Sequence, residues 1–184
     1  MKFHLCWLLA CLTCNYLFAQ DSTASLKARQ LKGNLTFLGA GLNYEQRIYN
    51  SATVNLEAQI STSLGYSGND YNGSHWSYAL TPMFSAEFRQ YYNFARRQAK
   101  GKNSRNNAGN FFSFTGGFRT ESLAYSGADP ETGIMLIPAW GIQRNWGKRI
   151  SFEGRFGWEF SKDNRENSWE DIPNIRLSVG YVIF

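Results

Sequence analysis

Apolar and polar side chains alternate with a period of two through most of this chain. From Val54 to Tyr66 the even positions are mostly apolar, whereas the odd positions hold Thr, Asn, Glu, Gln and Ser. The same alternation runs from Ile150 to Phe160, where Phe and Trp alternate with Ser, Glu, Arg and Gly. A strand places successive side chains on opposite faces, whereas an amphipathic helix needs apolar residues at i+3 and i+4. The pattern therefore predicts an all-β protein.

We expect eight strands from these runs. The Gly39-Ala40-Gly41 stretch divides one long run into a tight hairpin, because glycine adopts turn dihedrals readily. If that run were a single strand the count would be seven, but bacterial membrane barrels have even numbers of strands. Pro82 and Pro138 each remove a ladder donor, so we expect bulges there. The eight predicted ranges are 29–38, 41–49, 53–66, 76–92, 110–125, 133–146, 150–162 and 172–184.

The apolar face of these strands favours a membrane barrel over a soluble protein. It is rich in large aromatics, while the opposite face carries charges well inside the strands; a soluble barrel reverses this arrangement. A β-sandwich also alternates, but its strands are normally shorter and its core is rich in Val, Ile and Leu. The fold class predicted is thus an eight-stranded antiparallel up-and-down transmembrane β-barrel. Two aromatic girdles are expected: Tyr49, Phe88, Tyr91, Tyr92, Phe112, Trp146, Phe152 and Tyr181 at one end, and Tyr66, Trp76, Tyr78, Tyr125, Trp158 and Phe160 at the other.

The first residues have the features of an export signal. Lys2 precedes an apolar run that is too short to span a membrane, and Ala19 suits signal peptidase. We therefore expect residues 1–19 to be a signal peptide and residues 20–184 to be the barrel domain. All three cysteines precede this cleavage point, which excludes disulfides and thiol catalysis in the mature chain. The alternative is a lipoprotein signal with a lipid on Cys11.

Several short segments resemble small eight-stranded outer-membrane β-barrel proteins of the Bacteroidota type, whose barrel is like the transmembrane domain of outer-membrane protein A. They are Leu42-Asn43-Tyr44-Glu45-Gln46-Arg47, Arg89-Gln90-Tyr91-Tyr92-Asn93 and the basic stretch from Gly101, together with the terminal Tyr181-Val182-Ile183-Phe184. The resemblance implies location in the outer membrane of a Gram-negative bacterium, among outer-membrane lipids. It also implies recognition of the C-terminal strand by the barrel-assembly machinery. Phe184 departs from the pattern, since it does not share the parity of Tyr181.

The polar positions, which alternate with the apolar ones along each strand, predict a charged interior for the barrel. An eight-stranded barrel is narrow enough to be filled by its own side chains, and buried charges must be paired. Near balance between the acids and the bases favours an internal salt-bridge network, and the alternative is an ion path. The residues expected inside are Glu45, Arg47, Glu57, Glu87, Arg89, Arg119, Glu121, Glu153, Arg155, Glu159 and Arg176.

The connection at 93–109 is long and basic. With both chain termini in the periplasm it is a periplasmic turn, and such turns are usually short. It is read as a solvated linker, as a segment that docks to phospholipid headgroups, or as a contact with a periplasmic partner. Nucleic acid is not expected as a partner of an exported protein. Its cations are Arg96, Arg97, Lys100, Lys102 and Arg105, with no acid among them.

No catalytic, metal or cofactor signature stands out, so a non-enzymatic barrel with a structural or interaction role is the function expected. Two alternatives stay open. One is a barrel that binds or transports a small hydrophobic ligand; the other is a lipid A-modifying enzyme that uses His75, which lies beside Ser74. The acidic segment 163–171 is more simply a solvated loop than a cation site, and 69–73 lacks the bidentate Glu of a calcium loop.

Overall fold

The computed structural model describes residues 25–69, 73–127, 132–164 and 168–184; the predicted export signal lies outside these ranges. The described residues form one antiparallel sheet of nine strands and two short helices, so the all-β prediction is confirmed. The elements are β1 (Arg29–Thr36), β2 (Gly39–Tyr49), β3 (Ala52–Asn69), β4 (Gly73–Tyr91), α2 (Phe94–Ala99), η2 (Arg105–Asn107), β5 (Asn110–Arg119), β6 (Ala124–Ser126), β7 (Gly133–Trp146), β8 (Ile150–Asp163) and β9 (Glu170–Val182).

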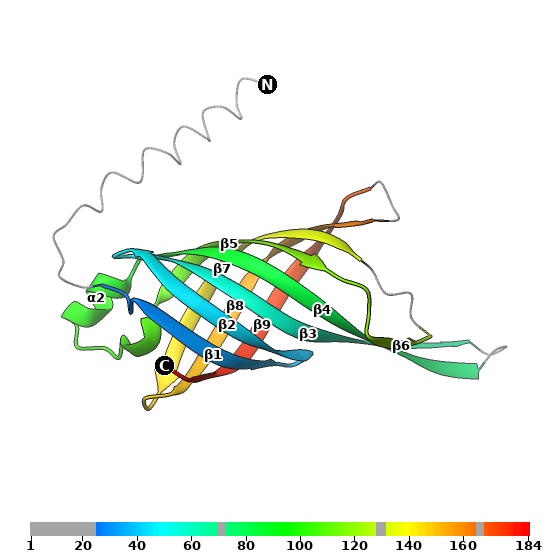
Figure 1. Ribbon diagram of the computed structural model, residues 1–184, viewed down its shortest axis with the longest axis horizontal. Helices are drawn as coiled ribbons and strands as arrows, with labels where there is room; N and C mark the ends of the chain where they lie inside the picture. Colours follow the sequence, from blue (N-terminus) through cyan, green and yellow to red (C-terminus); the bar gives the residue numbers. More distant parts are fainter. Residues whose placement is uncertain (1–24, 70–72, 128–131, 165–167) are drawn as a thin grey trace, which may run out of the picture.

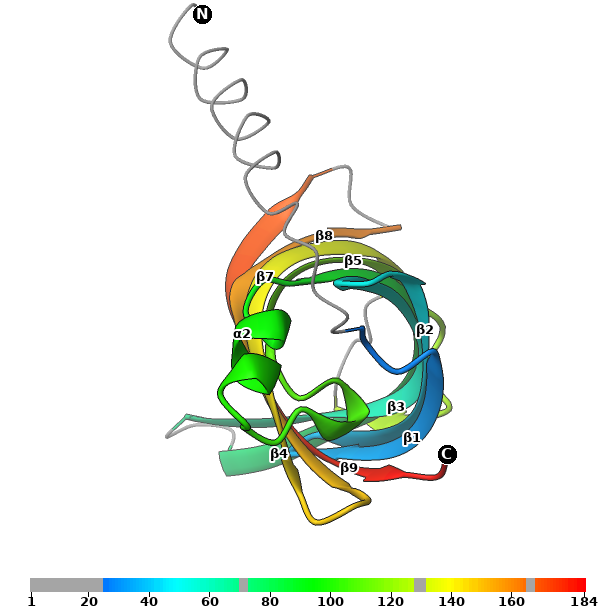
Figure 2. The same ribbon diagram turned by 90° about the vertical axis from the view of Figure 1, so that its left-hand side faces the viewer.

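Eight of the strands close into a ring. The order is β3-β2-β1-β9-β8-β7-β5-β4, and the pairing of β4 with β3 completes the circle (Figure 2). The eight strands are not spaced evenly around one axis, and β3 and β4 continue past the others as a two-stranded ribbon (Figure 1). The ring is compatible with a β-barrel.

The ring buries its polar side chains and exposes its apolar ones. Phe156 and Leu177 are 58% and 67% exposed, whereas Glu45 and Gln143 are fully buried. This is the reverse of a soluble protein, in which large apolar groups are inside and charges face water. The predicted parity of the strands therefore coincides with the two faces of the ring, with the polar parity inside.

Two local features differ from the predicted strands. The β1–β2 turn lies at Phe37-Leu38, and Gly41 lies within β2, where a Cβ would be 2.7 Å from the backbone oxygen of Ala58 in β3. Gly41 thus permits a close approach of two strands rather than a turn.

The predicted strand 110–125 is divided into β5 and β6, because the register with β4 shifts by two residues around Pro82. At Pro138 the β7–β8 ladder is interrupted without a change of register.

The two ends of the ring differ. At one end the 93–109 connection, which we call the cap, lies over one side of the opening, and residues 25–28 are at the same end (Figures 1 and 2). This capped end also holds the β2–β3 turn, the β7–β8 turn and Phe184. The opposite or far end holds the remaining connections and the β3–β4 ribbon.

Candidate functional site

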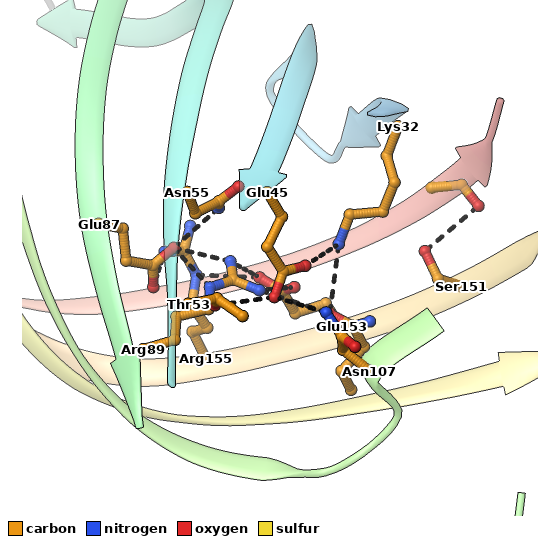
Figure 3. Close-up of polar contacts among 12 residues, drawn as sticks. Lys32, Glu45, Thr53, Asn55, Glu87, Arg89, Asn107, Ser151, Glu153 and Arg155 are labelled. Atoms are coloured by element: carbon orange, nitrogen blue, oxygen red, sulfur yellow. Dashed lines mark hydrogen bonds and ion pairs between the residues drawn. The ribbon is translucent and has the colours of Figure 1, made fainter. Parts of the chain in front are cut away.

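The interior of the ring holds a cluster of paired charges, drawn in part in Figure 3. Its members come from seven of the eight ring strands, each of which contributes between one and three charged side chains from its inward parity. Burial without pairing would be costly for every one of them. The interior charge cluster consists of Glu45, Glu57, Glu87, Glu153 and Glu159 with Lys32, Arg89, Arg119, Arg155 and Arg176.

Glu45 is the most densely coordinated carboxylate of the cluster. Its Oε1 accepts hydrogen bonds from Thr53 Oγ1 at 2.9 Å, Tyr91 OH at 2.9 Å and Asn107 Nδ2 at 3.0 Å. Its Oε2 accepts from Gln30 and lies 3.7 Å from Lys32 Nζ. Because these partners belong to three strands and the cap, Glu45 joins the cap to the wall of the ring.

A second group is built around Arg89. Its Nε and Nη2 donate to Glu87 Oε2 at 2.8 and 2.7 Å, and its two terminal nitrogens donate to Glu153 at 2.8 and 3.0 Å. Arg155 lies between the same two carboxylates, 2.8 Å from Glu87 and 3.3 Å from Glu153. Two guanidiniums and two carboxylates therefore neutralise each other inside the ring. Phe111 covers the Arg89 guanidinium at 4.6 Å.

Two further pairs lie elsewhere in the interior. Arg176 forms a bidentate pair with Glu57 across the ring, and Arg119 pairs with Glu159. Asn174 Nδ2 also donates to Glu159, at 2.8 Å. Two-pronged pairing of this kind is the strongest geometry that Arg and a carboxylate can adopt. The described interior thus carries equal numbers of positive and negative charges.

Nine of the eleven residues expected inside lie in this cluster, and two do not. Arg47 is at the capped end, where Nη1 donates to the Leu26 carbonyl at 2.7 Å. Glu121 is exposed in the β5–β6 connection. Lys32 was missed, although it shares the polar parity of Gln30 and Asn34 in β1 and could have been found by that signal. The buried amides that complete the network, such as Gln143 and Asn107, carry no charge pattern that would reveal them.

The cap is a folded plug rather than a solvated linker. Phe94 of α2 is buried with Leu26, Tyr91 and Phe111 in a small apolar core at the mouth of the ring. Asn107 of η2 is fully buried, and its Oδ1 accepts a 2.7 Å hydrogen bond from the backbone of Lys27. Further bonds join the cap to the β7–β8 hairpin, including Asn106 Nδ2 to the Lys148 carbonyl at 2.9 Å. Tyr91 was expected in the aromatic girdle, but its parity and the cap place it inside.

The cap leaves its cations at the surface. Arg96, Lys100, Lys102 and Arg105 are exposed and Arg97 is half-buried. Lys27, Lys148 and Arg149 add to them, and the described connections at this end contain no Asp or Glu. At the far end the described connections contain Glu121 and no cation. The ring is therefore electrically asymmetric from end to end.

The remaining candidates lie outside the interior of the ring. His75 lies in β4 opposite Ser67, on the ribbon beyond the ring, and Asp70 is outside the described residues. No group of His, Cys, Asp and Glu within the described ranges is arranged to hold a metal ion. An apolar depression of about 590 Å³ lies over Ala58, Ala86 and Gly116, between exposed side chains such as Leu42 and Phe118. These exposed walls place the depression on the outer face of the ring.

In the part of the chain that the structure covers, no helix is both long enough and apolar enough to cross a membrane. Comparisons with protein-family models, curated proteins and solved structures find no match to this chain. The resemblance to small outer-membrane proteins therefore stands on the short segments quoted above, and the assignment of a role depends on the geometry of the ring and its cap.

Proposed function

We propose that this chain is a non-enzymatic integral outer-membrane β-barrel, exported by a cleaved signal, with a filled interior and a structural or interaction role. The proposal depends on one observation: relative to a soluble protein, the apolar and the charged faces of the ring are exchanged. Large apolar side chains such as Phe156 and Leu177 are exposed on the outside, while the charged residues are paired inside. A hydrocarbon environment stabilises that outer face, whereas water does not.

The lengths of the strands support the same proposal. The ring strands other than β1 contain 10 to 19 residues, and a transmembrane strand needs about 9–11. A closed ring also leaves no unpaired edge within the hydrocarbon, which a membrane demands of any β-structure. Exposed aromatics lie near both ends, with Tyr92, Trp140 and Trp146 at the capped end and Tyr66 and Trp76 on the ribbon.

A closed interior favours a structural or interaction role over transport. In the interior charge cluster every charged side chain has a partner of opposite charge, and the cap lies at one mouth of the ring. Ion conduction would need unpaired polar space along the axis, and a hydrophobic ligand would need an apolar chamber. The apolar depression on the outer face of the ring is instead suited to contact with lipid chains.

The proposal can be tested by fractionation and electrophoresis. The full chain expressed with its export signal should be recovered in the outer-membrane fraction, and an unboiled sample should migrate differently from a boiled one because a closed barrel resists detergent. In planar bilayers the folded protein should show no stable open channel. Recovery in the soluble periplasm would exclude the membrane proposal, and steady conductance would exclude the filled interior.

A further inference from the structure

Two arginines at the rim of the capped end are held in place without a carboxylate. Arg97 of α2 donates through Nε to the Ala108 carbonyl at 3.0 Å and through Nη2 to the Asn103 carbonyl at 2.8 Å. Arg144 of β7 donates through Nη1 to the Gln143 carbonyl and through Nη2 to Asn110 Oδ1, both at 2.7 Å. Backbone carbonyls and an amide thus fix both guanidiniums, and each keeps further N–H donors.

The two side chains are linked through the cap. Asn103, whose carbonyl accepts from Arg97, donates from Nδ2 to the carbonyl of Asn145 at 3.2 Å, and Asn145 follows Arg144 in β7. Neither arginine forms an ion pair with any described Asp or Glu. Each Arg of the interior charge cluster, by contrast, pairs with at least one carboxylate. Two adjacent guanidiniums repel each other unless an anion lies between them, and a phosphate group matches their planar donors.

Hydrogen bonds join this pair to two exposed aromatic side chains. Asn110, which Arg144 contacts, also donates from Nδ2 to Tyr92 OH at 3.1 Å, and Trp140 Nε1 donates to the same hydroxyl at 3.0 Å. Tyr92 and Trp140 are exposed on the outer face of the ring. Tyr and Trp at such a position lie at the level of lipid headgroups, with their rings toward the hydrocarbon.

We propose that Arg97 and Arg144 form a binding site for the phosphate of an anionic phospholipid, whose headgroup carries no neutralising cation, at the capped rim, with Tyr92 and Trp140 against the adjoining part of that lipid. The inference rests on the proposed membrane location and names a partner for this end of the ring. The shared hydrogen bonds through Asn110 and Tyr92 connect the charged and the aromatic halves of the site. Recognition of phosphate by Arg is strong because the guanidinium can donate two parallel hydrogen bonds.

The test uses the full mature chain folded into vesicles of equimolar phosphatidylglycerol and phosphatidylcholine. The protein is then extracted in mild detergent, and the retained lipids are identified by native mass spectrometry. Phosphatidylglycerol should be enriched by roughly fivefold or more over phosphatidylcholine, which corresponds to about 1 kcal/mol of preference. The Arg97→Gln/Arg144→Gln variant should lose this enrichment.

The matched control is Lys100→Gln/Lys102→Gln, which removes the same charge from exposed positions of the cap. It should retain the enrichment, and equal loss in both variants would replace the site with a diffuse charge effect and overturn the proposal. Binding of inorganic phosphate that depends on Arg97 and Arg144, with no enrichment of phosphatidylglycerol, would overturn the lipid as its source.

Heat-modifiable migration, measured on every sample, separates the two proposals. If the wild-type chain is not heat-modifiable, the membrane barrel itself is wrong. A heat-modifiable wild-type chain that shows no enrichment refutes the lipid site alone.

Discussion

Glu45 is the carboxylate of the interior charge cluster that contacts the largest number of residues. In Glu45→Gln the shape is kept but Lys32 is left buried without its counter-charge, and Tyr91 and Asn107 compete for a neutral acceptor. Breaking a buried pair by removing one partner costs about 3–5 kcal/mol. We expect the free energy of unfolding, measured by urea titration of the protein in vesicles with Trp fluorescence, to fall by about this amount.

Glu121→Gln is the control for that experiment. It makes the same chemical change at an exposed position of the β5–β6 connection, and such substitutions usually change stability by less than about 0.5 kcal/mol. Equal effects of the two substitutions would show that the contacts of Glu45 contribute nothing beyond its charge.

Two strand glycines make an equally matched pair. Gly41→Ala should destabilise the β2–β3 pairing, because the new Cβ would be 2.7 Å from the Ala58 carbonyl oxygen and β3 would have to shift. Gly33→Ala, in β1, meets nothing within 4 Å. It should leave stability unchanged or raise it, since Ala restricts the unfolded chain more than Gly does. The urea midpoints of the two variants should therefore move in different directions, and a common shift would contradict the close approach of β2 and β3.

At the scale of elements, the cap should depend on Asn107. Asn107→Asp places a second carboxylate beside Glu45 in the fully buried site, where like charges disfavour each other strongly. We expect the cap to separate from the ring and its basic segment to become accessible. Trypsin, which cleaves after Lys and Arg, should then cut between Arg96 and Arg105 roughly tenfold faster than in the wild-type chain.

Gln98→Glu is the control for the Asn107→Asp variant. It also exchanges an amide for a carboxylate, but at an exposed position of α2. Its rate of cleavage should stay close to that of the wild-type chain. Rapid cleavage of the wild-type cap would mean that the cap is not held against the ring.

The strands could be predicted from the sequence, but the cap could not. A period of two is a local signal, so it placed Glu57, Glu87 and Arg155 on the inner face without any knowledge of pairing. The position of the cap depends on contacts between distant residues, such as Asn107 with Glu45 and with Lys27. Its polar, basic composition is the same as that of a solvated loop. For the same reason the burial of Tyr91 and Phe94 was not foreseen, since only the folded cap covers them.

At the scale of the whole molecule, the assignment of inside and outside can be tested with neighbouring positions. Ile60 is exposed on the outer face of β3, and Ser61 follows it on the inner parity. An Arg on the lipid face costs about 2–4 kcal/mol at mid-depth. Ile60→Arg and Phe156→Arg should therefore reduce the heat-modifiable fraction, and Ser61→Arg should be milder because the polar interior can pair a new charge. Greater damage from the inward substitution would reverse our assignment of the two faces.

The uneven charge of the two ends also bears on how the chain enters a bilayer. Insertion requires one end of every hairpin to travel through hydrocarbon, and each Lys or Arg carried across the midplane adds on the order of 2–4 kcal/mol to the barrier. The described connections of the capped end contain Lys27, Lys148, Arg149 and the five cations of the cap, whereas those of the far end contain none. On the proposed outer-membrane location, the far end would be the end that crosses the bilayer first, and the capped end, with Phe184, would remain on the side from which the chain arrived. The positions of the cations would then set the orientation of the chain before any strand has crossed.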